Sequence, residues 1–155
     1  MPVIRRRSRS AVRRLFVAGA LALAACQREG GDLPAPAFGT ATCAACGSVI
    51  DDPRFAAQYR LAEGTVKSFD DPACLFDALR SEARAPDAVR FHTYTADSWV
   101  GPSEVWFART PSTTAHGSGW AAHPSFAAAQ EAVTAAGSGE IASFEQAKTR
   151  LRRTS

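Results

Sequence analysis

The order of hydrophobic and polar residues predicts a β-hairpin near the start of the folded part of the chain. Bulky apolar residues alternate with smaller or polar ones over residues 55–61, and residues 65–69 are rich in types that favour strands. The Ala-Glu-Gly sequence at 62–64 separates these segments and is typical of a tight turn. The two segments are therefore expected to pair as adjacent strands.

A helix is predicted directly after this hairpin. Asp71 and Pro72 have the composition of a helix start, with aspartate as the N-cap and proline at the first helical position. Apolar residues then recur at helical spacing as Leu75, Phe76 and Leu79. Pro86 lies beyond the expected end of this helix.

The second part of the chain continues the alternation of strands and helices. Strands are expected at 89–94, 104–108, 119–122 and 140–143, and a turn is expected at 97–102. An alanine-rich helix is expected over 125–136, where Gly137 ends it. Ser143 and Gln146 are spaced as a capping box for a last short helix. The fold class is therefore α+β.

One sequence pattern occurs twice. Residues 64–69 and 139–144 both read Gly-x-[Val/Ile]-x-Ser-Phe, and each is followed by a predicted helix. A Phe-Ala-Ala segment precedes each copy, at 55–57 and at 126–128. The repeat indicates two related β/α units, and chance similarity in an alanine-rich sequence is the alternative.

The first 25 residues are typical of an export signal. Six arginines precede an apolar stretch, 15–25, that is too short to span a bilayer as a helix. The stretch ends in Leu-Ala-Ala-Cys, which resembles a bacterial lipobox and predicts lipidation of Cys26. The alternative is an ordinary secretory signal that contains a cysteine.

A lipobox predicts a lipid-anchored protein on the periplasmic side of a bacterial membrane. Gln27 favours the outer membrane, and the export route stays open between Sec and twin-arginine.

Removal of this signal changes the charge of the protein. Six of the 18 lysines and arginines lie in the signal, which leaves 12 against 15 acidic residues and turns a net charge of +3 into −3. We therefore expect no nucleic-acid partner.

Residues 26–42 contain glycines and prolines and are predicted to be a flexible tether. Residues 43–152 form the predicted folded domain, with possible halves at 43–95 and 96–152.

Three cysteines remain after Cys26 is assigned to lipid. Cys43 and Cys46 lie three positions apart, and Gly47 permits the positive φ that a turn presenting both sulfurs often needs. This spacing suits a soft metal ion, a structural zinc ion or a short disulfide. Thiol catalysis is a further alternative, but no helix is predicted directly after the pair. An odd number of thiols argues against a simple disulfide framework.

The third thiol, Cys74, is expected in the first turn of the helix that begins at Pro72. The positive end of the helix dipole would lower the pKa of a thiol there and favour a metal-binding thiolate. The alternative is that Cys74 is a small buried apolar residue. His116 lies in a loop of small residues and is a candidate ligand, whereas His92 and His123 fit packed or solvated positions better.

Thiolates and an imidazole suit Cu(I) or Zn(II), and the spacing alone does not separate the two metals. The acidic pairs at 51–52 and 70–71 fit turns and a helix cap better than an acid–base pair. No Ser-His-Asp arrangement or phosphate-binding glycine loop is evident. The chain is therefore predicted to bind a metal and not to be an enzyme.

These features occur in an order that resembles the NosL family, the accessory lipoproteins of nitrous-oxide reductase maturation. The shared features are the lipobox, the short tether, Cys-x-x-Cys-Gly at 43–47, Phe-Ala-Ala-Gln at 55–58, Phe-Asp-Asp-Pro-Ala-Cys-Leu at 69–75, Trp-Val at 99–100 and a late Gly-Ser-Gly-Trp-Ala segment. The resemblance covers residues 43–146. It implies a periplasmic lipoprotein that binds one Cu(I) and delivers it to the apo reductase. It also implies a fold of two small ββαβ-type units, similar to a domain of organomercurial lyase.

The chain departs from the family at two methionines. Ser48 follows Cys46-Gly47 where the family usually has methionine, and His116 stands in the later loop where methionine is common. The resemblance therefore implies a site of Cys43, Cys46, Cys74 and His116, with Cu(I) as the metal and Zn(II) as the alternative. A protein-interaction domain stabilised by zinc or a disulfide, and a thiol–disulfide oxidoreductase, are the alternative functions.

Overall fold

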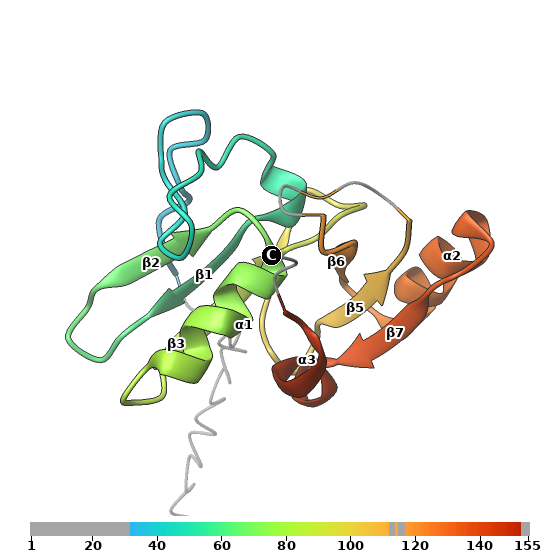
Figure 1. Cartoon of the computed structure of the whole chain (residues 1–155). Helices are drawn as coiled ribbons and strands as arrows, with labels where there is room; N and C mark the ends of the chain where they lie inside the picture. Colours follow the sequence, from blue (N-terminus) through green and yellow to red (C-terminus); the bar gives the residue numbers. More distant parts are fainter. Residues whose placement is uncertain (1–31, 112–113, 115–116, 153–155) are drawn as a thin grey trace, which may run out of the picture.

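The first sheet is built on the predicted hairpin (Figure 1). β1 (Ala57–Arg60) pairs antiparallel with β2 (Val66–Phe69) on one side and with β3 (Ala88–His92) on the other. Successive side chains of each strand point to opposite faces of the sheet, and Tyr59 of β1 is buried on the face toward the core. With β4 (Trp99–Val100) the strand order is β2-β1-β3-β4, and the predicted hairpin is confirmed.

The structure is a computed structural model that describes residues 32–111, 114 and 117–152. The predicted signal, the predicted lipidation site Cys26 and the candidate ligand His116 lie outside this described part. Within it, no helix combines the length and the apolar character needed to cross a membrane.

Two segments differ from the sequence-based expectation. Trp99–Val100, expected in a turn, forms the short strand β4, because Val100 is buried and pairs with Phe91 of β3. The strand expected from residue 55 begins at Ala57 instead. The residues before it form a 3₁₀ turn, η1 (Pro53–Phe55), since the Asp52 side chain caps that turn.

Helix α1 (Pro72–Ser81) begins where the sequence predicts. The Asp71 side chain accepts a hydrogen bond of 2.7 Å from the Ala73 backbone N–H, so it is the N-cap. The helix packs against β1 and β2 and also contacts the second sheet at β6 (Trp120–His123). It therefore lies between the two sheets and touches both.

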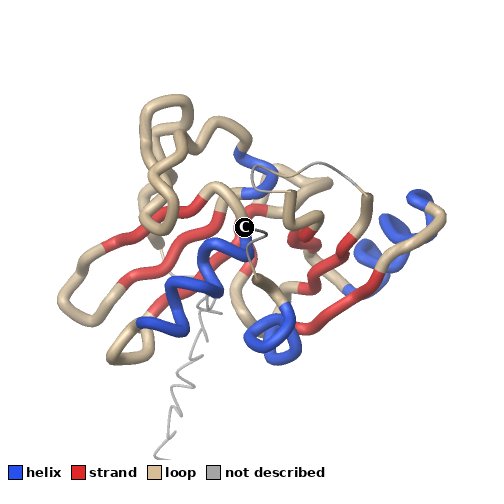
Figure 2. Tube along the Cα trace, viewed as in Figure 1, coloured by secondary structure: helices blue, strands red, loops and turns tan. Residues whose placement is uncertain are grey.

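The second sheet has the order β6-β5-β7, with β5 (Trp106–Arg109) pairing antiparallel with β6 and with β7 (Glu140–Ser143). Helix α2 (Phe126–Ala136) covers one face of this sheet and ends at Gly137, whose φ is +75°. Helix α3 (Phe144–Arg150) begins with the predicted capping box of Ser143 and Gln146. The chain thus runs strand–strand–helix–strand twice, with the first strand central each time (Figure 2).

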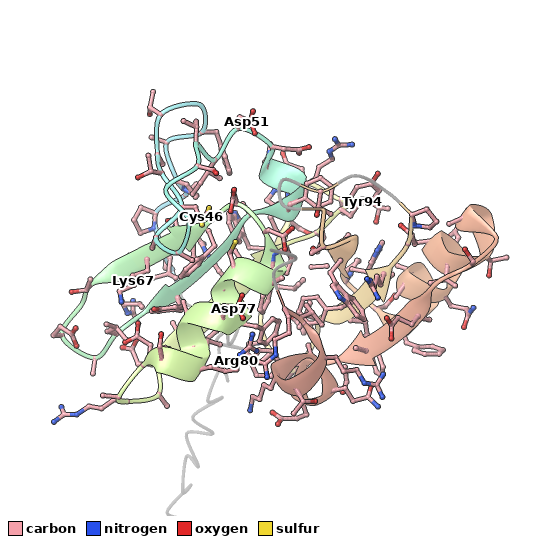
Figure 3. The ribbon with its side chains drawn as sticks, viewed as in Figure 1. Cys46, Asp51, Lys67, Asp77, Arg80 and Tyr94 are labelled. Atoms are coloured by element: carbon pink, nitrogen blue, oxygen red, sulfur yellow. The ribbon has the colours of Figure 1, made fainter. Side chains whose placement is uncertain are left out.

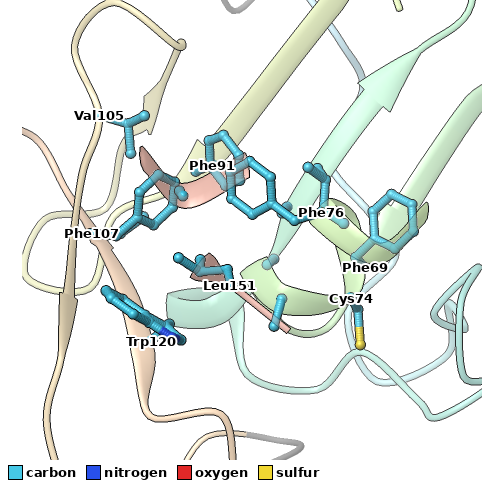
Figure 4. Packing of buried hydrophobic residues seen from close by; sticks show 14 of the residues in the cluster. Phe69, Cys74, Phe76, Phe91, Val105, Phe107, Trp120 and Leu151 are labelled. Carbon is cyan, nitrogen blue, oxygen red and sulfur yellow. The ribbon is translucent and has the colours of Figure 1, made fainter. Parts of the chain in front are cut away.

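One hydrophobic core joins the two sheets. Phe76 of α1 lies 5.6 Å from Phe91 of β3 and 5.5 Å from Phe107 of β5, measured between ring centroids. Phe91 and Phe107 meet edge to face at 4.9 Å. Figure 4 shows these rings at the centre of the cluster, with Phe69 and Cys74 at one end. The described part of the chain is therefore held together by one core that includes both predicted halves.

The packed chain begins ahead of Thr42. Leu33 and Pro36 are buried although they lie in the segment predicted as a tether. The carbonyl oxygen of Pro34 accepts a hydrogen bond of 3.1 Å from the Gln58 side chain in β1. Gln58 lies on the sheet face opposite the core, so residues 33–36 cover that outer face.

Candidate metal centre

A tight turn presents the first two cysteines. Thr42 and Val49 form an antiparallel bridge, and inside it the Cys43 N–H donates to the Ser48 carbonyl at 2.8 Å. The Gly47 N–H donates back to the Cys43 carbonyl at 2.9 Å, which closes one turn around both thiols. Gly47 has φ +79°, so the predicted need for glycine is confirmed. We call residues 42–49 the knuckle.

The knuckle is attached to the end of β2, where the third thiol enters. The Ala44 N–H donates to the Ser68 carbonyl at 2.9 Å. The chain then passes through Asp70 to the cap of α1, and Cys74 follows in the first helical turn. Figure 3 shows the sulfur of Cys46 at the tip of the knuckle, above the start of α1.

Four side chains meet at this point. The ligand atoms of Cys43, Cys46, Asp70 and Cys74 all lie within 4.8 Å of one another. Cys43, Asp70 and Cys74 are buried, whereas Cys46 is partly exposed and forms the outer edge. Its Sγ lies 3.7 and 3.8 Å from the two carboxylate oxygens of Asp70. The four residues form a candidate metal site.

The three cysteines predicted from the sequence are thus brought together, and Asp70 is an addition. The sequence assigned Asp70 only to a turn or cap. Its separation of four residues from Cys74, across the start of a helix, is a signal that could have found it. Asp71 occupies the N-cap, which leaves the Asp70 side chain to face the thiols.

Two of the thiols share a hydrogen bond. The Cys74 thiol donates to Cys43, which lowers the pKa of Cys43 to about 6 against the opposing effect of burial. Backbone N–H groups of Asp70 and Ala45 also donate to Cys43 and act in the same direction. These hydrogen bonds favour the thiolate form of Cys43, which is the form that binds metals.

The prediction that the helix start lowers the pKa of Cys74 is wrong. The hydrogen bond to Cys43 raises the pKa of Cys74, because it holds the proton on Cys74 beside a thiolate. Burial raises it further, and the carboxylates of Asp70 and Asp71 add repulsion. A bound cation would compete with this proton for the Cys74 sulfur.

Ser48 supports the outer thiol. Burial raises the pKa of Cys46, and the neighbouring Cys43 adds to the rise. The Ser48 hydroxyl and backbone N–H donate hydrogen bonds to Cys46 and act in the opposite direction. Hydrogen bonds of this kind stabilise thiolates in metal sites. Ser48 therefore contacts a candidate ligand, the thiol of Cys46.

The second sheet also contributes to the site through Asp71. The Ser118 hydroxyl lies 2.9 and 2.8 Å from the two carboxylate oxygens of Asp71, and the Thr114 hydroxyl lies 3.2 Å from that of Ser118. All three residues are buried. Ser118, which lies between β5 and β6, therefore contacts the cap of α1, three residues before Cys74 in the chain.

His92 and His123 do not join the cluster. His92 contacts Asp97 at 3.0 Å and the edge of Trp99, and His123 is buried at the inner face of α2. Both are packed residues, as expected. His116 falls outside the described residues.

This arrangement suits a thiophilic cation. Three sulfur ligands favour Cu(I) and Zn(II), and a carboxylate oxygen adds a fourth, harder ligand that suits Zn(II). The two ligands of the knuckle and the two ligands from residues 70–74 come from separate segments, so an ion would connect them.

Comparisons of this chain with models of protein families, with curated proteins and with solved structures found no match.

Replacing Ser118 by alanine is expected to destabilise the protein by about 1–3 kcal/mol, because the buried Asp71 carboxylate loses its hydroxyl donor. Urea unfolding followed by tryptophan fluorescence measures this change. Ser103 is exposed and serves as the matched control, for which Ser103→Ala should change stability by less than about 0.5 kcal/mol. Equal effects of the two substitutions would contradict the proposed role of Ser118.

Proposed function

We propose that the protein is a periplasmic, lipid-anchored carrier of one metal ion, with Cu(I) as its cargo. The observation that supports this most is the convergence of Cys43, Cys46 and Cys74 on one point, with only Cys46 partly exposed among them. Two buried sulfurs hold an ion, and the outer sulfur gives a partner protein a place to begin ligand exchange. The protein itself catalyses no reaction in this proposal.

The packing favours a carrier over a structural metal site. The core of aromatic rings joins both sheets at residues that do not belong to the thiol cluster. The knuckle has its own backbone hydrogen bonds and is attached to β2 at Ser68. The contacts that join the sheets therefore involve no candidate ligand, which supports a protein that loads and unloads its cargo.

The identity of the metal has two candidates. Three thiolate ligands suit Cu(I), so Cu(I) is the first candidate for the bound metal. The carboxylate of Asp70 beside Cys46 favours a second candidate, a zinc-binding protein, because oxygen is a poor ligand for Cu(I) and an ordinary one for Zn(II).

The proposed partner is a copper enzyme that receives the ion. The ordered motifs shared with the NosL family support apo nitrous-oxide reductase as this enzyme, with anchoring through Cys26. The same resemblance supports the interpretation that the two strand–strand–helix–strand groups are related units of the NosL and organomercurial-lyase kind. In this interpretation only the first unit carries the thiols, while the second supplies Ser118.

Purified, reduced protein is expected to bind one Cu(I) with a dissociation constant below micromolar, measured by competition with a chromophoric chelator. The double substitution Cys46→Ser, Cys74→Ser should abolish this binding, because it removes two of three sulfurs. Asp70→Asn should weaken Zn(II) binding by at least about tenfold and leave Cu(I) binding nearly unchanged.

Asp51→Asn is the matched control for Asp70→Asn, since Asp51 is an exposed acid next to the knuckle. Binding of both metals that survives the double cysteine substitution would refute the carrier proposal. Strong loss of Cu(I) binding in Asp70→Asn would contradict a site in which the three sulfurs alone hold Cu(I).

Removal of the metal is expected to leave a folded protein. The metal-free form should keep its near-ultraviolet circular dichroism and a cooperative thermal transition, because the aromatic core needs no ion. Added metal raises the free energy of unfolding by mass action alone, by about 4 kcal/mol at a thousandfold excess over the dissociation constant, and the melting temperature rises with it. A metal-free form without a cooperative transition would instead support a structural zinc site.

A further inference from the structure

The turn of the knuckle brings Cys43 and Cys46 into the range of a disulfide. The hydrogen bond from the Gly47 N–H to the Cys43 carbonyl closes a helix-like turn around residues 43–47. In such a turn the Cα atoms of residues i and i+3 lie less than about 7 Å apart, and disulfides join Cα atoms about 4.4–6.8 Å apart. The three thiols are unlinked in the structure.

Access to solvent distinguishes the thiols. Within the described part of the chain, Cys46 is partly exposed, whereas Cys43 is 3% and Cys74 is 0% exposed. A dissolved disulfide therefore reaches Cys46 first. Cys43 lies behind it in the same turn, and Cys74 lies deeper, in the first turn of α1.

We propose that the knuckle is a redox switch in which Cys43 and Cys46 form a reversible disulfide by exchange with a small or protein-borne disulfide. The Cys46 sulfur attacks the external disulfide and expels its first thiol. The Cys43 sulfur then attacks Cys46 in the mixed disulfide and expels the second thiol. The two cysteines lose two electrons and two protons, and the external disulfide is reduced to two thiols.

Cys74 stays reduced in this reaction. It also contacts Cys43, but a Cys43–Cys74 bond would join two separate segments, whereas the Cys43–Cys46 bond lies within one turn. The backbone N–H of Cys74 donates to the Asp71 carbonyl at 3.0 Å, which fixes Cys74 to the capped start of α1. The turn therefore favours the local bond.

The switch would control the metal, a consequence that rests on the proposed function. The disulfide removes two of the four candidate ligands and leaves Cys74 and Asp70, which are too few to hold a Cu(I) or Zn(II) ion tightly. Oxidation thus releases the ion, and reduction of the knuckle restores the site. The carrier would load only in its reduced form.

Peptide mapping tests the switch directly. Reduced protein is treated with oxidised glutathione, alkylated and digested with trypsin. Cleavage after arginine and lysine places Cys43 and Cys46 in peptide 29–54 and Cys74 in peptide 68–80, while Cys26 falls in neither of them. The expected product is peptide 29–54 with two hydrogens fewer, together with alkylated Cys74. A cross-link between 29–54 and 68–80, or glutathione that remains on Cys46, would overturn the proposal.

Two variants make the order of attack visible. Cys74→Ser should form the same disulfide at the same yield, whereas Cys43→Ser should stop at a glutathione adduct on Cys46. A Cys74→Ser protein that forms no disulfide would contradict the local bond. A Cys43→Ser protein without the adduct would contradict entry through Cys46.

A metal-release measurement separates the switch from the proposed function. Protein loaded with Zn(II) should release one ion for each disulfide formed, followed with a chromophoric chelator. Protein that binds metal but forms no disulfide contradicts the switch alone. Protein that forms the disulfide but binds neither Zn(II) nor Cu(I) contradicts the carrier function alone.

Discussion

The buried carboxylate of Asp71 is the contact on which the position of the thiols depends. It caps α1 through the Ala73 N–H and accepts hydrogen bonds from Ser118 of the second half. Burial raises the pKa of this carboxyl, and the hydrogen-bond donors around it oppose that rise. A carboxylate in this environment is tolerated only while its donors stay in place. The cap therefore fixes the start of α1, and with it Cys74, to both sheets at once.

This constraint explains why the site lies at the edge of the core. Cys74 and Phe69 occupy one end of the cluster of buried residues, and the sulfur of Cys74 points away from the aromatic rings (Figure 4). The rings provide a rigid wall on one side, while the knuckle covers the sulfur on the other. The site is thus shielded from water except at Cys46. A packed core behind a partly exposed outer thiol suits the proposed role of a metal carrier.

The sequence predicted those parts that depend on local chemistry. Asp71-Pro72 has the composition of a helix cap, and Cys-x-x-Cys-Gly requires a turn with a positive φ at Gly47, so the helix start and the knuckle were predictable. The convergence of the three cysteines was predicted from their number and the resemblance to a metal-binding family. The short strand β4 was missed because two residues carry too little pattern to distinguish a strand from a turn.

The remaining errors concern long-range contacts. The pKa of Cys74 depends on a thiol 31 positions earlier in the sequence, and local reasoning about the helix dipole could not include it. Asp70 was assigned to a turn because its burial beside Cys46 arises only when the knuckle folds onto β2. The contribution of Ser118 likewise depends on how the second sheet packs against α1. Each of these contacts joins segments that lie far apart in the sequence, so local sequence patterns do not reveal it.

The central claim is that three cysteine sulfurs bind one ion together. X-ray absorption spectroscopy of the Cu(I)-loaded, reduced protein tests it most directly, because sulfur and the lighter oxygen or nitrogen ligands scatter differently. We predict a first shell of three sulfur atoms that falls to two in Cys74→Ser. A shell dominated by oxygen or nitrogen, or one unchanged by that substitution, would contradict this account of the site.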